Sequence, residues 1–352
     1  MMNNKPLVSV VVPAYNVDQY IDKCIQSVQA QTYDNWELLL VVGGQDRTVE
    51  ICDAYAAKDK RIKSIHDNHG LAPARNVGFE HANGDWITYI DGDDWTDPET
   101  LAVAVGKTNE YPELDVVFWT YENDLDGKAI PSKWTYSEFK DEELFDEKGC
   151  KELAYRTLKY SCGISVCNSK LISMEFAKRF GIKHDDRLLQ GEEGVEFVLR
   201  CFYHARKALF LKRPFYHYVF NRNSISKKVN YKNTKNIADC FKVMREDIDG
   251  FDNPTRYIPL YYERMVYGII AVAMNTYFNP QNDDSVRSRI RKFKEDIIDN
   301  EMFSDALDKV TTENMDKLRK ITLFFIRHRM YFVVQSIAWV KWFMIKFNFF
   351  SY

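Results

Sequence analysis

Several chemistries are missing from the sequence, and each absence excludes a class of protein. None of the seven cysteines forms a CxxC pair or a cluster with histidine at zinc-binding spacing. This usage is typical of buried thiols in a reducing compartment, and not of a disulfide framework. With 48 Lys and Arg against 51 Asp and Glu, the formal net charge is -3. No overall basic excess therefore calls for a nucleic-acid partner.

Long hydrophobic runs are also absent. The apolar start Leu7–Val12 is short and runs into Pro13, so we expect no secretory signal and a cytoplasmic protein. Met265–Phe278 is uncharged for 14 residues, too few to cross a bilayer, and a buried helix is expected there. Hydrophobic residues make up 45% of the 352, which is enough for a large α/β domain with an appendage or for two domains.

The first 115 residues alternate short apolar runs with helical spacing. Helices are expected after Asp18, Asp46 and Pro73. Strands are expected at Leu7–Val12, Trp36–Val42, Arg61–Ile65 and Trp86–Ile90, and the first should be buried on both faces of the sheet. This order predicts an α/β fold with a mostly parallel sheet flanked by helices.

The rest of the chain changes character twice. Residues 116–230 are mixed, with a strand expected at Val116–Tyr121 and a helix at Asp141–Lys159. Residues 231–317 have a helical pattern, and residues 318–352 form a distinct tail. We therefore expect four parts, of which 1–115 and 116–230 make up one α/β domain.

The acidic run Asp91-Gly92-Asp93-Asp94 directly follows the fourth expected strand. Ligands of open α/β sheets bind outside the carboxyl ends of the strands. Hard carboxylate oxygens there suit Mg²⁺ or Mn²⁺, which share their other coordination positions with water and phosphate oxygens. The alternative is a solvated Asp-Gly turn.

A series of motifs in fixed order resembles family 2 glycosyltransferases with the GT-A (Rossmann-like) fold. The motifs are Val8–Asn16, Gln31–Tyr33, Ala74–Gly78, and Asn83–Asp85 leading into Asp91–Asp94. Gly191–Glu193 with Phe197 resembles the family's Glu-Asp segment. Tyr216–Tyr218 and Arg222–Ser226 resemble a motif of members that build bacterial capsular or lipopolysaccharide chains. The resemblance covers about residues 7–230 and is accompanied by a helical C-terminal region.

The resemblance implies an inverting transfer of a sugar from a nucleotide-diphosphate donor to a lipid-linked or growing surface polysaccharide. Mn²⁺ or Mg²⁺ on Asp93, with Asp91 on the metal or the ribose, would neutralise the departing diphosphate. His217 is a third metal ligand, a diphosphate contact or a core histidine. Glu193, with Glu192 beside it, is the expected catalytic base, and the alternative is that both begin an exposed helix.

Further residues are expected at the donor. By motif position these are Pro13, Tyr15, Asn16, Asp46, Arg75, Arg222 and Ser224. Arg222 and Ser224 would hold phosphate oxygens, and the alternative role of Arg222 is to form an ion pair at the surface. Arg75 is alternatively a structural partner of an aspartate, and the simplest role of Asp46 is to cap the next helix.

The sequence departs from the family at one place. Acidic residues usually follow the second strand and contact the base and ribose, whereas Val41 and Val42 occupy those positions here. A catalytically idle relative that binds partners in a polysaccharide-assembly complex is therefore the alternative function. An active enzyme is favoured by the joint retention of the acidic residues Asp91, Asp93, Asp94, Glu192 and Glu193.

The tail contains six Lys or Arg, no Asp or Glu, and eleven aromatic residues among residues 318–352. This composition favours peripheral contact with the anionic inner leaflet of the plasma membrane. The alternative is a helical pair packed on the enzyme or on a second subunit of a homo-oligomer.

Overall fold

The computed structural model describes residues 5–125, 127–132, 138–160, 162–220 and 229–346. The chain forms two compact units. Unit 1 comprises residues 1–157 and 161–221, and unit 2 comprises residues 158–160 and 222–352. The four-part organisation expected from the sequence stays a prediction.

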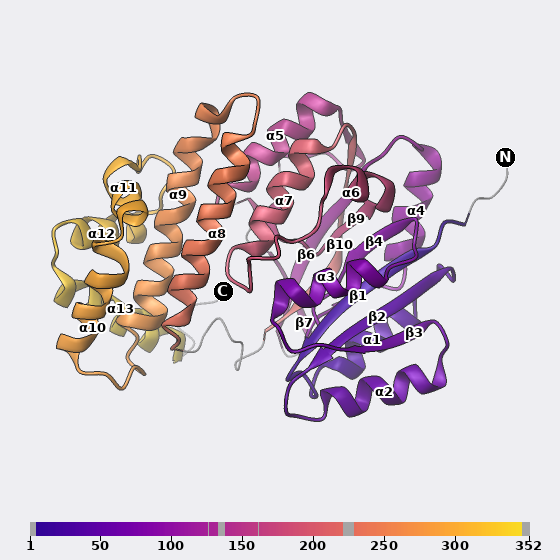
Figure 1. Ribbon diagram of the computed structural model, residues 1–352, viewed down its shortest axis with the longest axis horizontal. Coiled ribbons are helices and arrows are strands. Elements are labelled where there is room, and N and C mark those ends of the chain that lie inside the picture. The colour runs from indigo at the N-terminus through magenta and orange to yellow at the C-terminus, as the bar shows by residue number, and fades with distance from the viewer. Residues whose placement is uncertain (1–4, 126, 133–137, 161, 221–228, 347–352) are drawn as a thin grey trace. The chain divides into compact units, whose positions relative to one another are not determined.

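Unit 1 is built on a mixed sheet of ten strands within the described ranges (Figure 1). Its order is β3-β2-β1-β4-β9-β6-β10-β5, with β7 beside β6 and β8 beside β10. The strands are β1 Val8–Tyr15, β2 Trp36–Gly43, β3 Ile62–His66, β4 Trp86–Tyr89, β5 Trp95–Thr96, β6 Val116–Leu125, β7 Lys128–Pro131, β8 Glu143–Phe145, β9 Lys170–Ser173 and β10 Ala208–Val219.

The expected parallel order is found in one half of the sheet. Strands β3, β2, β1 and β4 are mutually parallel, as are β6 and β10. The pairs made by β5, β7, β8 and β9 are antiparallel. The four N-terminal strands predicted from apolar runs are confirmed as β1 to β4. In β1, Val10, Val11 and Val12 are buried, as a strand covered on both faces requires.

Helices cover both faces of this sheet. Side chains of α1, α2 and α4 share a core with Val10, Val12 and Leu40 of the sheet, whereas Gly78 of α3 packs on Val11 from the other side. The helices of unit 1 are α1 Ile21–Gln29, α2 Thr48–Lys58, α3 Leu71–His81, α4 Thr100–Glu110, α5 Glu147–Thr157, the 3₁₀ turn Gly163–Ser165, α6 Met174–Phe180 and α7 Glu193–His204.

One expected helix is shorter than its pattern. The prediction of a helix over Asp141–Lys159 was wrong at its start, because Glu143–Phe145 form β8 and pair with β10. The helix itself begins at Glu147 and ends at Thr157.

Unit 2 is helical in its described residues. Its elements are α8 Lys232–Asp249, α9 Pro254–Val272, the π-helical turns Ala273–Tyr277 and Lys294–Ile298, α10 Val286–Phe293, α11 Glu301–Lys309, α12 Lys317–Arg327 and α13 Tyr331–Lys346. The uncharged stretch Met265–Phe278 lies in α9 and the first π-helical turn, and most of its side chains are buried as expected. Among the described helices, none combines the length and the apolar character that crossing a membrane requires.

Candidate active site

The turn Asp91–Asp94 follows β4 and lies against the end of β1. Gly92 donates its backbone N–H to the carbonyl of Pro13 at 3.2 Å, and Asp94 donates to the carbonyl of Asp91 at 2.9 Å. A Cβ at Gly92 would lie 3.1 Å from Ala14 Cβ, so glycine lets the turn approach β1 closely. The acidic run therefore has a defined place at the carboxyl edge of the sheet.

Asp94 fastens this turn to β10. Its side chain is buried, its Oδ2 is hydrogen-bonded to the hydroxyl of Tyr216, and its Oδ1 accepts from the backbone N–H of Val219 at 2.8 Å. Burial raises the pKa of Asp94 well above its usual value, and the charges of Asp93 and Asp91 raise it further. Asp94 thus has a structural place in the turn.

Both carboxylate oxygens of Asp91 are engaged by neighbouring side chains. Arg75 Nη2 donates to Oδ1 at 2.8 Å, and Asn168 Nδ2 donates to Oδ2 at 2.9 Å. Asn168 Nδ2 also lies 2.7 Å from the hydroxyl of Tyr216, so it connects the turn to β10. Asn168 lies in none of the sequence motifs, so nothing in the sequence pointed to it as a site residue.

Arg75 joins the acidic turn to the expected base. Its side chain is almost completely buried, and its Nη1 donates to Glu193 Oε1 at 3.1 Å while Nη2 holds Asp91. The structure therefore brings Arg75, Asp91 and Glu193 together from three distant segments. The alternative role of Arg75, a structural pair with an aspartate, describes only half of its contacts.

Glu193 opens α7 and is 5% exposed. Its Oε2 is a buried oxygen without a hydrogen-bond partner among the described residues. Burial raises the pKa of Glu193, and the positive charge of Arg75 opposes this rise. Such a carboxylate is suited to accept a proton from a hydroxyl group.

The two neighbouring glutamates differ in burial and in contacts. Glu192 is the N-cap residue of α7 and is half-buried. Glu196 is fully buried and bonded to Arg200. The alternative of an exposed helix start is wrong for Glu193, because its side chain is buried against Arg75.

His217 lies on β10 between two carboxylates. Its Nε2 lies 2.8 Å from Asp97 Oδ1, and its Nδ1 lies 2.9 Å from Glu122 Oε1. The imidazole stacks on Trp95 with ring centroids 3.6 Å apart. A metal on His217 would have to displace one of these carboxylates.

The carboxyl ends of β1 and β2 carry the remaining expected donor contacts. Tyr15 is half exposed, and Asn16 has a φ of 54° and accepts a hydrogen bond from Gln45 N at 2.7 Å. Asp46 accepts from the backbone N–H groups of Thr48 at 3.0 Å and Asp18 at 3.1 Å. The capping alternative therefore describes the contacts of Asp46.

Comparison with known proteins identifies the family of the N-terminal half of the chain. The model of the family described as Glycosyl transferase family 2 matches residues 9–181. The chain carries a family 2 glycosyltransferase domain. It is 26% identical over 331 residues to a Bacillus subtilis protein, EpsH, whose name assigns it as a glycosyltransferase, and the match covers 92% of each chain.

Solved structures share the fold of this glycosyltransferase. S. aureus TarS, residues 1–349 in complex with UDP-GlcNAc, superposes with a TM-score of 0.66 at 18% identity, covering 94% of this chain and 90% of that one. A mannosyltransferase from Pyrobaculum calidifontis, in complex with GDP-Man and Mn²⁺, gives 0.53 at 13% identity, covering 96% and 86%. The likeness extends over both units and supports the expected GT-A fold.

The carboxylates of the turn fit a divalent metal that is shared with a substrate. Asp91 and Asp93 supply hard oxygen atoms, and Mg²⁺ or Mn²⁺ commonly binds one or two carboxylates together with phosphate oxygens. Within the described ranges, no group of three or more His, Cys, Asp or Glu side chains could enclose a metal. Arg222 and Ser224 lie outside the described residues.

A buried lysine holds the loop that carries Asn168. Lys170 Nζ donates to the carbonyls of Ile164 at 2.9 Å and Val166 at 2.5 Å. Burial lowers the pKa of Lys170 to about 8. The sequence offered no signal for this residue, because a lysine becomes a core residue only through tertiary contacts.

Proposed function

We propose that this glycosyltransferase transfers a sugar from a nucleotide-diphosphate donor with inversion at the anomeric carbon. The observation that carries the proposal is the buried Arg75, which contacts Asp91 of the acidic turn and Glu193 at once. A site for the leaving group and a base for the acceptor therefore lie within the reach of one guanidinium.

Glu193 Oε2 is the oxygen that we assign to the acceptor's proton. The acceptor hydroxyl oxygen attacks the anomeric carbon from the face opposite the diphosphate, and its proton moves to Oε2. The bond from the anomeric carbon to the diphosphate breaks, and the electron pair leaves on the diphosphate oxygen. Single displacement of this kind inverts the configuration and requires no covalent intermediate on the protein.

Asp93, with Asp91 beside it, would hold Mn²⁺ or Mg²⁺ at the diphosphate. The metal, when bound, supplies positive charge that stabilises the leaving group. Pro13, Tyr15 and Asn16 would line the donor at the end of β1. His217 is retained as a diphosphate contact or third ligand only if it releases Asp97 or Glu122.

A screen of nucleotide-sugar donors with and without divalent metal tests this function. We expect metal-dependent turnover or hydrolysis of at least one donor, and loss of metal-dependent donor binding in Asp93→Ala. No turnover and no calorimetric binding of any nucleotide would instead support the catalytically idle alternative, which Val41 and Val42 at the end of β2 favour.

We propose that the acceptor is lipid-linked or a growing surface polysaccharide, and that the tail binds the inner leaflet. Most exposed large apolar side chains of the described residues lie in α12, α13 and the turn between them. They are Leu318, Ile321, Phe324, Met330, Phe332, Trp339, Val340 and Phe343. The tail has six basic residues and no acidic one, so the charge of this surface complements anionic lipid.

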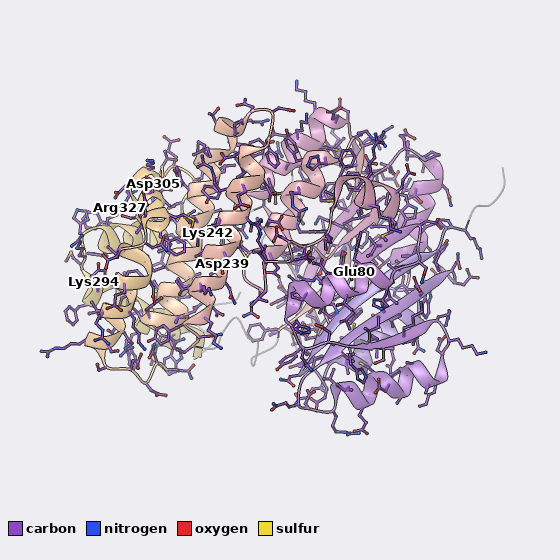
Figure 2. The ribbon with its side chains drawn as sticks, in the orientation of Figure 1. Glu80, Asp239, Lys242, Lys294, Asp305 and Arg327 are labelled. Atoms are coloured by element: carbon purple, nitrogen blue, oxygen red, sulfur yellow. The ribbon has the colours of Figure 1, made fainter. Side chains whose placement is uncertain are left out.

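The tail helices also bury a second stripe within unit 2. Leu323, Ile326 and Val334 are buried, and Arg327 donates to the carbonyls of Leu307 at 2.6 Å and Val310 at 3.2 Å near the end of α11 (Figure 2). Removing the whole tail would therefore expose the core of unit 2. The membrane proposal is better tested by substitutions on the exposed stripe.

A further inference from the structure

The carboxyl end of β2 offers no acidic side chain to a nucleotide. Val41 and Val42 are almost fully buried, so their side chains lie in the core on either face of the sheet. The chain continues through Gly43 and Gly44, which have no side chains to offer. A contact to the nucleobase at this place must come from another segment.

Asn68, in the loop after β3, occupies that place. A Cβ at Gly43 would lie 2.3 Å from Asn68 Oδ1 and 2.4 Å from the carbonyl of Asp67. Gly44 donates its backbone N–H to Asn68 Oδ1 at 2.9 Å. The Asn68 amide thus lies where a side chain at the end of β2 would otherwise stand.

The hydrogen bond from Gly44 determines which way the amide faces. A backbone N–H can only donate, so the atom that it contacts is the oxygen, and Nδ2 points to the other side. Asn68 is exposed, and its Nδ2 makes no hydrogen bond with another described residue. Two N–H donors are therefore available to a ligand.

The position also fits the length of a nucleotide bound at the acidic turn. The sheet order β2-β1-β4 puts two strand spacings, about 10 Å, between the end of β2 and the turn after β4. The half-exposed Tyr15 ends the intervening β1 and is paired in register with Gly43. A diphosphate at Asp91–Asp94 would then have its base near Tyr15 and Asn68.

We propose that Asn68 selects the nucleobase of the donor by donating from Nδ2 to O4 of uracil or O6 of guanine. The inference rests on the proposed nucleotide-sugar donor. Uracil carries the acceptor O4 where cytosine carries an amino donor, and guanine carries the acceptor O6 where adenine carries an amino donor. The amide donor favours uridine and guanosine diphosphates and opposes the other two.

The test is Asn68→Asp, with affinities for UDP, GDP, CDP and ADP measured by calorimetry in Mn²⁺. Aspartate has the same shape and retains an oxygen for Gly44 N–H, but it replaces the donor by an acceptor. We expect the wild-type chain to prefer UDP or GDP, and the UDP/CDP or GDP/ADP affinity ratio to fall about tenfold or more in the variant. Using a ratio cancels the repulsion that the new charge exerts on every diphosphate.

Asn35→Asp is the matched control. Asn35 precedes β2 at the opposite edge of the sheet, where its Nδ2 donates to the carbonyl of Lys5 at 2.7 Å, and its substitution should leave the ratios unchanged. Equal ratios in wild type and Asn68→Asp would overturn the role of Asn68 while leaving the proposed function intact. Failure of the wild-type chain to bind any of the four nucleotides would overturn both.

Discussion

At the scale of single residues, the site is organised by side chains whose polar groups each contact two other residues. Arg75 joins Asp91 to Glu193, and Asn168 joins Asp91 to Tyr216. Hydrogen bonds to charged groups are stronger than neutral ones, and a buried charge without its partner is costly. The orientation of Glu193 therefore depends on residues that sequence motifs do not connect to it.

Glu193→Gln should abolish transfer while leaving the donor bound. Glutamine keeps the shape of the side chain but cannot accept the acceptor's proton, so we expect kcat to fall about 10²–10⁴-fold with the donor's KM little changed. Glu80→Gln, at an exposed glutamate of α3 (Figure 2), is the control and should keep full activity. If Glu192→Gln loses transfer and Glu193→Gln does not, the base is Glu192.

The pH dependence of transfer should report the environment of Glu193. Because burial raises its pKa, the acid limb of the rate profile should lie above the ordinary range of a glutamate. Arg75→Gln removes a positive charge that stabilises the carboxylate, so the pKa rises again and the limb moves to higher pH. Arg47→Gln, at an exposed arginine, should leave the limb in place. A limb that does not move in Arg75→Gln contradicts the pairing.

At the scale of elements, helix α3 sets where Arg75 lies. Its Gly78 packs so closely on β1 that a Cβ there would lie 2.2 Å from Val11 Cγ1. Cores tolerate added volume poorly, so the helix can approach the sheet only with glycine at this position. Arg75 is three residues earlier, almost one turn away, and moves with the helix.

Gly78→Ala should therefore destabilise the protein and reduce transfer together. We expect the free energy of unfolding to fall by about 1–3 kcal/mol, measured by urea denaturation with tryptophan fluorescence. Gly106→Ala is the matched control, since a Cβ in the middle of α4 would meet nothing within 4 Å. There the better helix propensity of alanine should stabilise by about 0.5–1 kcal/mol. Equal effects of the two variants would be evidence against the close packing of α3.

At the scale of the whole molecule, the candidate active site and the exposed apolar stripe belong to different units. The described residues of the candidate active site belong to unit 1, and the basic apolar tail belongs to unit 2. The exposed stripe recurs along α13 at Phe332, Trp339 and Phe343, while Tyr331, Val334 and Ala338 are buried. One helix thus has a face that is buried within its own unit and an exposed apolar face.

Phe332→Ser, Trp339→Ser and Phe343→Ser together should weaken binding to phosphatidylglycerol vesicles in a sedimentation assay. Binding of the unaltered chain should fall with added salt and be weak on phosphatidylcholine, because each basic residue contributes about 1 kcal/mol at an anionic surface. Leu144→Ser, on the exposed surface of unit 1, should change neither. A triple variant that binds as before, or that only alters the mass of a lipid-free oligomer, assigns the stripe to another partner.

The sequence by itself determined the features that follow from short-range pattern. Apolar runs and helical spacing predicted the parallel strands of the N-terminal half and the place of Asp91–Asp94 after β4. Such patterns can be read within a short stretch of sequence, because the spacing of apolar residues differs between a buried strand and an amphipathic helix. Motif order predicted Glu193 and Arg75 as site residues, and it predicted the family whose model matches residues 9–181. The sequence also showed that Val41 and Val42 replace the acidic residues that are usual in the family. It did not show which other residue could contact the nucleobase.

Only the tertiary structure decided the contacts between distant segments. Tyr216 and Asp91 are 125 positions apart, and Arg75 and Glu193 are 118 apart. Asn168 and Asn68 are single polar residues with no repeating pattern, so their roles arise when the sheet brings loop ends together. The burial of Glu193 also depends on distant segments. The local sequence predicts an exposed glutamate at the start of a helix, and the side chain becomes buried only when other elements cover it.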